Sequence, residues 1–145
     1  MNAMQVDSPL GKITLVAEGD ALIAVCLDGT TPALQRAARQ LSEYFEGRRD
    51  RFELPLAAEG TDFERAVWSA LDEIPFGQTR SYSDIARQIG RPKAVRAVGA
   101  ANAKNPLAVV RPCHRVIGAA GALTGYSGGL SRKRWLLAHE NRRAK

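Results

Sequence analysis

The spacing of apolar residues changes along the chain, and this change limits the folds that it can adopt. Residues 12–16 alternate polar and apolar side chains, which is typical of a half-buried strand. After a turn at 18–20, the apolar run 21–27 predicts a second, buried strand. Beyond residue 31 the longer apolar segments follow the spacing of helices. This order predicts an α/β fold, with a short antiparallel sheet and a helix followed by a mainly helical lobe.

The first predicted helix opens at Thr31-Pro32, because a proline in the first turn loses no helical hydrogen bond. Residues 47–50 end this helix, and a polar stretch up to Gly60 is expected to link two lobes. We therefore predict an N-terminal structural lobe at 1–58 and a second lobe at 59–145. The apolar residues of the helix form one buried stripe made of Leu34, Ala37, Leu41, Tyr44 and Phe45.

The second lobe is predicted to open with a capped helix, because Thr61 lies three residues before Glu64 in the pattern of a capping box. Two short helices follow at 81–90 and 93–103, joined by a glycine-containing turn, which is the outline of a helix-turn-helix. Small residues dominate the second of these helices, so its backbone can approach a partner closely. Such helix pairs are nevertheless more often core packing than DNA readers. A terminal helix is expected at 131–139.

Basic residues are concentrated in the second lobe. Residues 1–58 hold 6 Lys/Arg against 8 Asp/Glu, whereas residues 59–145 hold 15 against 7, and the whole chain has a formal net charge of +6. A basic half of this kind indicates contact with a polyanion such as nucleic acid. On charge alone, general solubility is an equally good explanation.

The chain has two cysteines, Cys26 and Cys113, and two histidines. These residues do not have the number or spacing of a zinc site. A single disulfide stays possible, but a chain of this size without a secretory signal is expected in a reducing compartment, the cytoplasm. The longest apolar run, 21–27, is too short to cross a membrane, so no membrane partner is expected. Cys26 lies within that run and is interpreted as a structural thiol.

The segment 111–115, Arg-Pro-Cys-His-Arg, holds the strongest candidate for chemistry. A cysteine is nucleophilic only as a thiolate, so a base, a cation or a helix end must lower its pKa. The imidazole of His114 follows directly, and Glu140 could orient it as the third member of a nucleophile–base–acid system. Because adjacent strand residues point to opposite faces, Cys113 and His114 require a turn or a bridging water. An isolated Cys-His pair is more often structural.

Several motifs of the second lobe occur together and in order. They are Asn105-Pro106, Pro112-Cys113-His114-Arg115-Val116, Gly125-Tyr126-Ser127-Gly128-Gly129 and Trp135-Leu136-Leu137-x-His139-Glu140. Over residues 62–140, more than half of the chain, this pattern resembles the O6-alkylguanine-DNA alkyltransferase family, also called methylated-DNA–protein-cysteine methyltransferases. The resemblance implies a ribonuclease-H-like front lobe and a winged-helix-like back lobe that carries the helix-turn-helix.

The resemblance also implies catalytic roles. Cys113 would accept the alkyl group in an in-line displacement, with guanine as the leaving group. His114 would act as its base through a water molecule and would be held by Glu140. Asn105 would brace the turn that presents Cys113. Tyr82 would help to rotate the nucleotide and would donate a proton to the departing guanine. No metal or organic cofactor is implied.

The implied DNA and substrate contacts lie on the same lobe. A base in a duplex must be flipped before its alkyl group can be reached, and Arg96 would act as the arginine finger that fills the vacated stack. The small-residue helix around Arg96 suits close approach to a minor groove. Tyr126, Ser127 and the adjoining glycines would form the wall and lip of the guanine pocket. Further expected substrate or DNA contacts are Ala97, Arg115, Gly128 and Lys133.

The implied function is DNA repair by direct reversal. A monomer would transfer the alkyl group of O6-alkylguanine in double-stranded DNA irreversibly and stoichiometrically to Cys113, and cooperative binding to DNA is left open. The alternative is a non-catalytic protein that binds alkylated lesions, but such relatives replace the acceptor cysteine. A helix-turn-helix regulator would need a polar recognition helix, and 93–103 holds few polar side chains. A cysteine hydrolase would need a pocket for an acyl group, and no motif in the sequence indicates one.

Three features depart from the family pattern. Arg111 stands where an apolar residue is usual, and Ala108 stands where many members have a second proline. Either change could alter the edge of the pocket or the stiffness of the loop. The front lobe is also shorter than is common, which leaves the completeness of its sheet open.

Overall fold

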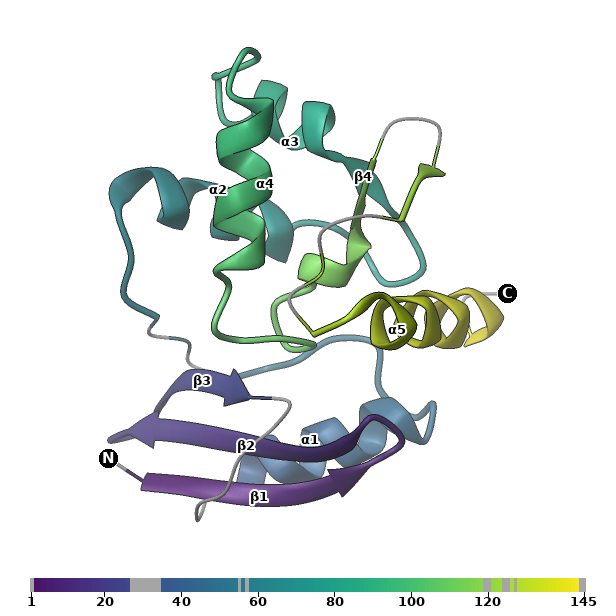
Figure 1. Ribbon diagram of the computed structural model, residues 1–145. Helices are drawn as coiled ribbons and strands as arrows, with labels where there is room; N and C mark the ends of the chain where they lie inside the picture. Colours follow the sequence, from purple (N-terminus) through teal and green to yellow (C-terminus); the bar gives the residue numbers. More distant parts are fainter. Residues whose placement is uncertain are drawn as a thin grey trace. The chain divides into compact units, whose positions relative to one another are not determined.

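The computed structural model describes residues 2–26, 35–54, 56, 58–118, 121–123, 126 and 128–143. The chain divides into two compact units (Figure 1), residues 1–59 with 106–110, and residues 60–105 with 111–145. The sequence placed the short segment 106–110 in the second lobe, whereas the structure places it with the first unit. No helix among the described residues has the length and apolar character to cross a bilayer.

The first unit contains a three-stranded antiparallel sheet in the order β1-β2-β3, formed by β1 (Asn2–Ser8), β2 (Gly11–Glu18) and β3 (Ala21–Cys26). The predicted strands 12–16 and 21–27 correspond to β2 and β3. β1 was not predicted. None of its residues from Ala3 to Ser8 is fully buried, and the strand is held by pairing with β2 along its whole length.

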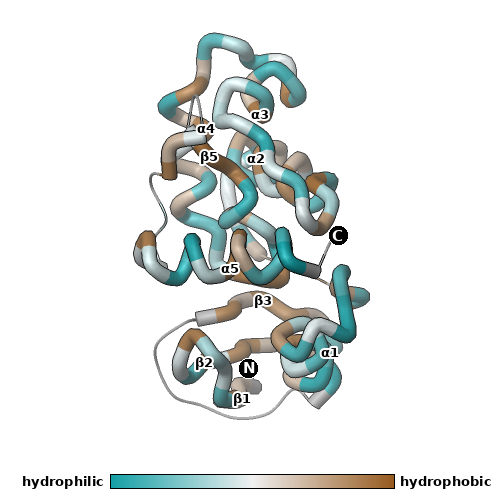
Figure 2. The backbone as a smooth tube through the Cα atoms, turned by 90° about the vertical axis from the view of Figure 1, so that its right-hand side faces the viewer, coloured by the Kyte–Doolittle hydropathy of each residue, from teal (hydrophilic) through white to brown (hydrophobic). Residues whose placement is uncertain are grey.

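Residues on alternate positions of β2 build the core of this unit, because successive strand residues point to opposite faces. Ile13, Leu15 and Ala17 are completely buried. Helix α1 (Gln35–Phe45) covers a face of the sheet (Figure 1) and contributes buried apolar side chains of its own, Ala37, Leu41 and Tyr44. Figure 2 shows the apolar character that runs along β3. The predicted helix start at Thr31-Pro32 and Leu34 lie outside the described residues.

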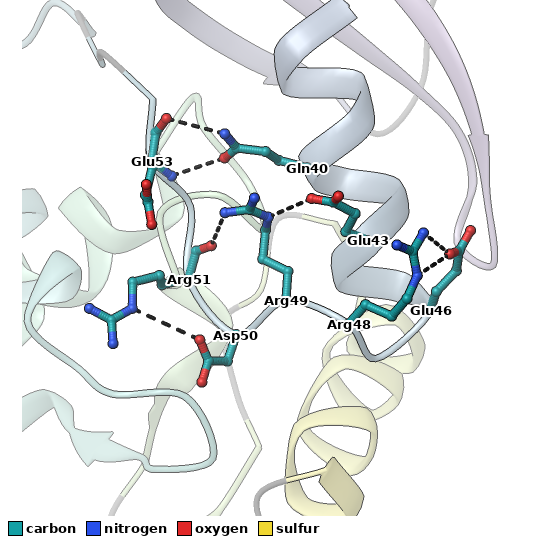
Figure 3. A network of polar contacts seen from close by, with 8 residues as sticks. All are labelled: Gln40, Glu43, Glu46, Arg48, Arg49, Asp50, Arg51 and Glu53. Atoms are coloured by element: carbon teal, nitrogen blue, oxygen red, sulfur yellow. Dashed lines mark hydrogen bonds and ion pairs between the residues drawn. The ribbon is translucent and has the colours of Figure 1, made fainter.

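Polar side chains fix the segment that follows α1 (Figure 3). The amide of the buried Gln40 pairs with the backbone of Glu53, because Oε1 accepts from its N–H at 2.9 Å and Nε2 donates to its carbonyl at 3.2 Å. Arg49 Nε donates to Glu43 Oε1 at 2.9 Å. A bridge between Leu22 and Leu56 continues this attachment to the sheet.

Residues 106–110 also attach to the sheet of the first unit. Val25 N–H donates to the carbonyl of Pro106 at 2.5 Å, and a bridge joins Val25 to Leu107. Val109 has a φ of 72°, and Val110 N–H donates to the carbonyl of Ala108 at 2.9 Å. These values describe a γ-turn with positive φ, which is a rare and strained conformation for a β-branched residue.

The second unit packs three helices together, α2 (Asp62–Asp72), α3 (Tyr82–Gln88) and α4 (Val95–Ala103). The capping box of α2 is confirmed, because Glu64 N–H donates to Thr61 Oγ1 and Thr61 N–H donates to Glu64 Oε1. A second capping box, between Ser81 and Asp84, starts α3 and was not predicted. The pair α3–α4 is the predicted helix-turn-helix, although α4 begins at Val95 rather than Lys93.

The rest of the second unit surrounds the segment that contains Cys113. A 3-10 turn, η1 (Cys113–Arg115), leads into β5 (Val116–Ile117), which pairs in parallel with β4 (Arg80–Ser81). Helix α5 (Leu130–Arg143) continues beyond the predicted end at His139, so Glu140 lies within it.

Candidate active site

Cys113 begins the turn η1 in a strongly bent segment. Pro112 has φ −81° and ψ 61°, and Cys113 N–H donates to the carbonyl of Arg111 at 2.8 Å. This is an inverse γ-turn. The thiol is free, and the residue as a whole is only 3% exposed. Since Cys113 and His114 lie on a 3-10 turn rather than a strand, the turn geometry that their cooperation requires is present.

His114 and Glu140 lie together, as the sequence suggested. His114 Nε2 is 2.7 Å from Glu140 Oε2, and both side chains are buried. Burial lowers the pKa of His114, and the neighbouring Glu140 only partly offsets this effect. Burial opposes ionisation of Glu140, but hydrogen bonds and charges from His114 and Arg115 outweigh it and lower the pKa of the carboxyl. A neutral imidazole therefore faces an ionised carboxylate.

This pairing determines which nitrogen of His114 can act as a base. With Nε2–H donated to Glu140, Nδ1 carries the lone pair, as the hydrogen-bond network assigns it. Nδ1 is buried and has no hydrogen-bond partner among the described residues. The imidazole thus keeps one unpaired acceptor in a site that is closed to bulk solvent.

Arg115 was predicted to contact substrate or DNA, and its position contradicts this prediction. Its side chain is buried and forms a fork with Glu140, with Nε donating to Oε1 at 2.7 Å and Nη2 to Oε2 at 2.9 Å. Nη1 donates to the carbonyl of Ile74 at 2.6 Å. Planar two-bond pairing of this kind fixes a carboxylate firmly. Arg115 therefore holds Glu140, which in turn holds His114.

The environment of the Cys113 thiol contains opposing influences. Burial raises its pKa, while a hydrogen bond from Asn105 and the positive charges of Lys133 and Arg111 act in the opposite direction. Lys133 is fully buried on α5, where its Nζ donates to the carbonyl of Val116 at 2.6 Å and lies 5.9 Å from the ring centre of Tyr82. Burial also lowers the pKa of Lys133.

Two asparagines brace the backbone around the thiol. Asn105 Nδ2 donates to the carbonyl of Arg111 at 3.1 Å, the position expected for a brace of this turn. Asn102 Nδ2 donates to the carbonyl of Cys113 at 3.3 Å and was not predicted to be functional. Asn102 is buried on α4, and the signal that could have found it is a lone amide on a helix of small residues. The helix expected to meet DNA is thereby bonded to the acceptor residue.

The remaining predicted positions divide into buried and exposed groups. Tyr126 is 8% exposed, and burial together with the nearby Cys113 raises its pKa. The Tyr126 hydroxyl has no hydrogen-bond partner among the described residues. Gly128 accepts a hydrogen bond from Arg132 through its carbonyl. Ser127 lies outside the described residues.

The exposed group lies on the helix-turn-helix. Arg96 and Ala97 are exposed on α4, and Tyr82 is half-buried at the start of α3. A Cβ placed on Gly99 would lie 3.9 Å from the Tyr82 ring, so this ring packs against α4. Within the described residues, no three His, Cys, Asp or Glu side chains gather where they could hold a metal ion.

The comparisons with known proteins agree with this arrangement. The family model described as 6-O-methylguanine DNA methyltransferase, DNA binding domain, matches residues 62–142, and the ribonuclease-like domain of the same family matches residues 4–58. A methylated-DNA–protein-cysteine methyltransferase of Mycobacterium bovis is 50% identical over 96% of this chain and 92% of that protein. A protein of the same name from Methanosarcina barkeri is 55% identical over 93% of this chain and 94% of that protein.

The solved structures point the same way. The crystal structure of Mycobacterium tuberculosis OGT in complex with DNA shares 48% identity, covers 99% of this chain and 94% of that one, and superimposes with a TM-score of 0.94. A ribonuclease-like unit followed by a helical unit with a buried Cys-His-Glu constellation defines a class of DNA-binding cysteine transferases. The chain belongs to the 6-O-methylguanine DNA methyltransferase family.

Proposed function

We propose that this chain repairs O6-alkylguanine in double-stranded DNA by moving the alkyl group irreversibly to Sγ of Cys113. The observation that carries this proposal is the intact, free Cys113 thiol next in sequence to His114, whose Nδ1 is buried and has no hydrogen-bond partner in the part of the chain that the structure describes. Family membership supports DNA repair by direct reversal, and the structural relative bound to DNA supports a DNA substrate.

The reaction begins with removal of a proton from Cys113. His114 Nδ1 takes the thiol proton through a bridging water, and Glu140 stabilises the imidazolium that forms. Because burial raises the pKa of Cys113, the free protein holds a protonated thiol until a substrate occupies the site. Asn105 and Lys133 then help to stabilise the thiolate.

Alkyl transfer is an in-line displacement. Sγ attacks the alkyl carbon, the new S–C bond forms as the C–O6 bond breaks, and the electron pair of that bond passes to the guanine. The guanine takes up a proton donated by the phenol of Tyr82 and leaves as the repaired base. The thioether has no good leaving group on the protein side, so each molecule acts once.

The exposed part of the helix-turn-helix presents the lesion to this site. An alkyl group inside a duplex is out of reach, so the base must rotate outward at a cost of a few kcal/mol. Arg96 fills the vacated stack, and the small Ala97 lets α4 approach the minor groove closely. Tyr126, with Ser127 and Gly128, forms the wall and lip of the guanine pocket. In this proposal a monomer carries out all these steps in the cytoplasm, on the nucleoid if the host is bacterial.

Intact-protein mass spectrometry tests the proposal. The chain is mixed with a duplex that contains one O6-methylguanine, beside a Cys113→Ser control. The expected result is a gain of one methyl group per molecule that saturates and is absent from the control. A folded protein that binds the lesion tightly without gaining mass would instead be a non-catalytic lesion binder, and absence of both binding and mass gain would overturn the DNA-repair proposal.

A further inference from the structure

Arg111, the residue that departs from the family pattern beside the acceptor motif, is held by two side chains of α2. Its Nε donates to Asp72 Oδ1 at 3.1 Å, and its Nη2 donates to Asp72 Oδ2 at 3.3 Å. The guanidinium carbon also lies 5.5 Å from the ring centre of Trp68. Only 10% of the Arg111 side chain is exposed. A planar cation that has both a carboxylate fork and an aromatic face is strongly fixed in orientation.

This clamp is itself anchored in the helical unit. Trp68 Nε1 donates to the carbonyl of Ala101 at 2.9 Å, which joins α2 to α4. Arg111 therefore does not occupy a loose position at the edge of the pocket. Its side chain ties the residue to a helix pair that contains the proposed DNA-facing surface.

The backbone of Arg111 carries the turn that presents the thiol. Its carbonyl accepts two hydrogen bonds, one from Asn105 Nδ2 at 3.1 Å and one from Cys113 N–H at 2.8 Å. A side chain that fixes residue 111 also fixes this carbonyl. The clamp on the guanidinium is therefore transmitted through one residue to the backbone of Cys113.

The charge of Arg111 also acts on the thiol. Among the described residues, the positive charges that act on Cys113 are Lys133 on α5 and, more weakly, Arg111, and the titratable groups beside the thiol are His114 and Tyr126. Burial lowers the pKa of Lys133, whereas an arginine keeps its proton throughout the accessible pH range. His114 is neutral and Tyr126 is protonated. Of these described groups, Arg111 is thus the one whose positive charge does not change with pH.

We propose that Arg111 is a positioning residue for alkyl transfer, which holds the turn of Cys113 through Asp72 and Trp68 and supplies a permanent positive charge to the thiol. This inference rests on the proposed acceptor role of Cys113. An apolar residue at position 111 keeps the main-chain turn but provides neither the clamp nor the charge. The two contributions are separable, because one affects the orientation of the thiol and the other its ionisation.

Three variants separate them. Arg111→Met removes both contributions at similar length, Arg111→Lys keeps the charge but loses the fork, and Asp72→Asn keeps Arg111 but removes its anchor. Each variant is compared with the wild type over a range of pH in two reactions. One is single-turnover methyl transfer from an O6-methylguanine duplex, and the other is alkylation of Cys113 by iodoacetamide, which needs no DNA. Thermal unfolding confirms that each variant is folded at every pH.

The expected results differ for each variant. Arg111→Met moves the midpoint of the iodoacetamide profile to higher pH and makes the reaction at neutral pH at least about threefold slower. Arg111→Lys keeps the midpoint nearer to that of the wild type, but it lowers the rate of methyl transfer at all pH values. Asp72→Asn also lowers methyl transfer at all pH values without raising the midpoint. If Arg111→Met does not fold, the other two variants decide the question.

Unchanged midpoints and unchanged transfer rates in the folded variants would overturn the inference. If Arg111→Met lowers the rate of methyl transfer equally at every pH and leaves the midpoint of the iodoacetamide profile unchanged, the charge of Arg111 does not act on the thiol. That result would overturn the proposal in this form. The proposed function has an independent readout. If the wild type takes no methyl group from the duplex, the acceptor role fails, while the iodoacetamide profiles still show whether Arg111 controls the thiol.

Discussion

His114 Nε2 lies 2.7 Å from Glu140 Oε2, and this contact fixes which imidazole nitrogen is free to act on the thiol. In Glu140→Gln the amide can donate to Nε2, which would move the ring proton to Nδ1 and remove the base. We expect single-turnover methyl transfer to fall by roughly 100-fold or more. The variant also leaves the buried Arg115 without its anion, so its unfolding temperature should fall. A transfer rate equal to that of the wild type would contradict the assigned role of Glu140.

The stability of the protein should depend on pH at both ends of the range. Burial lowers the pKa of His114 from 6.5, and the pKa of Glu140 is lowered from 4.5. The unfolded chain therefore binds more protons in acid, so stability is full above about pH 6.5 and decreases as the pH falls. Burial raises the pKa of Cys113 from 9.0, so stability also decreases above about pH 9.

Thermal unfolding between pH 4 and pH 10 tests this expectation. His114→Gln should weaken the decrease on the acid side, and Cys113→Ser should weaken it on the alkaline side. A flat profile in the wild type, or variants with unchanged profiles, would show that these buried groups do not control the stability.

Two glycine-to-alanine substitutions should separate the effect of side-chain packing on stability from the effect of close DNA approach on methyl transfer. A Cβ on Gly60 would lie 2.6 Å from Trp68 Cη2 and 2.7 Å from Cζ3. Because the Trp68 ring is fixed by its bond to Ala101, Gly60→Ala should reduce the free energy of unfolding by about 1–3 kcal/mol. Chemical denaturation measures this change, and a stability equal to that of the wild type would show that the Trp68 ring can move.

Gly99→Ala is the matched variant within α4. Its Cβ would meet only ordinary contact, 3.9 Å from the Tyr82 ring, and alanine favours a helix interior by about 0.5–1 kcal/mol over glycine. We expect this variant to be more stable but slower in methyl transfer from a duplex, because the added methyl group separates α4 from the minor groove. Faster or equal transfer would argue against close approach at this position.

Arg96→Ala should affect DNA opening rather than folding. Arg96 is exposed, so the free energy of unfolding should change by less than about 0.5 kcal/mol. Methyl transfer from a fully paired duplex should slow markedly, since the finger no longer occupies the vacated stack. The defect should shrink on a single-stranded oligonucleotide, where no pair has to open. Equal defects on both substrates would indicate that Arg96 acts only as a general phosphate contact.

Local sequence patterns predicted much of the fold, including the contacts between residues that are close together in the sequence. The Thr61–Glu64 capping box and the helix-turn-helix follow from spacing within a few residues, so no tertiary information was needed. β1 was harder to predict, because it is held by pairing with β2 and has no fully buried residue from Ala3 to Ser8. The γ-turn at Val109 has a backbone conformation that valine disfavours, and burial and pairing in the first unit stabilise it. No residue type in this segment predicts such a turn.

The site shows the same division. The pairing of His114 with Glu140 was expected from the resemblance to the family, and so was a contact of Arg115 with substrate or DNA. In the structure Arg115 instead pairs with Glu140, and the sequence does not show whether a basic side chain turns toward a buried carboxylate or toward the surface. Asn102 was missed for the same reason, because its bond to Cys113 depends on how α4 packs against η1.

The parallel pairing of β4 with β5 is short, but it joins two segments with different proposed roles. Arg80 pairs with Val116, and Ser81 pairs with Ile117. Ser81 immediately precedes Tyr82 and caps α3, while Val116 immediately follows η1. The proposed proton donor Tyr82 and the proposed alkyl acceptor Cys113 are therefore attached to the two paired strands, one to each. An insertion or deletion in either strand would move the proposed proton donor relative to the proposed acceptor, so sequence changes in the DNA-facing helices have to leave this pairing intact.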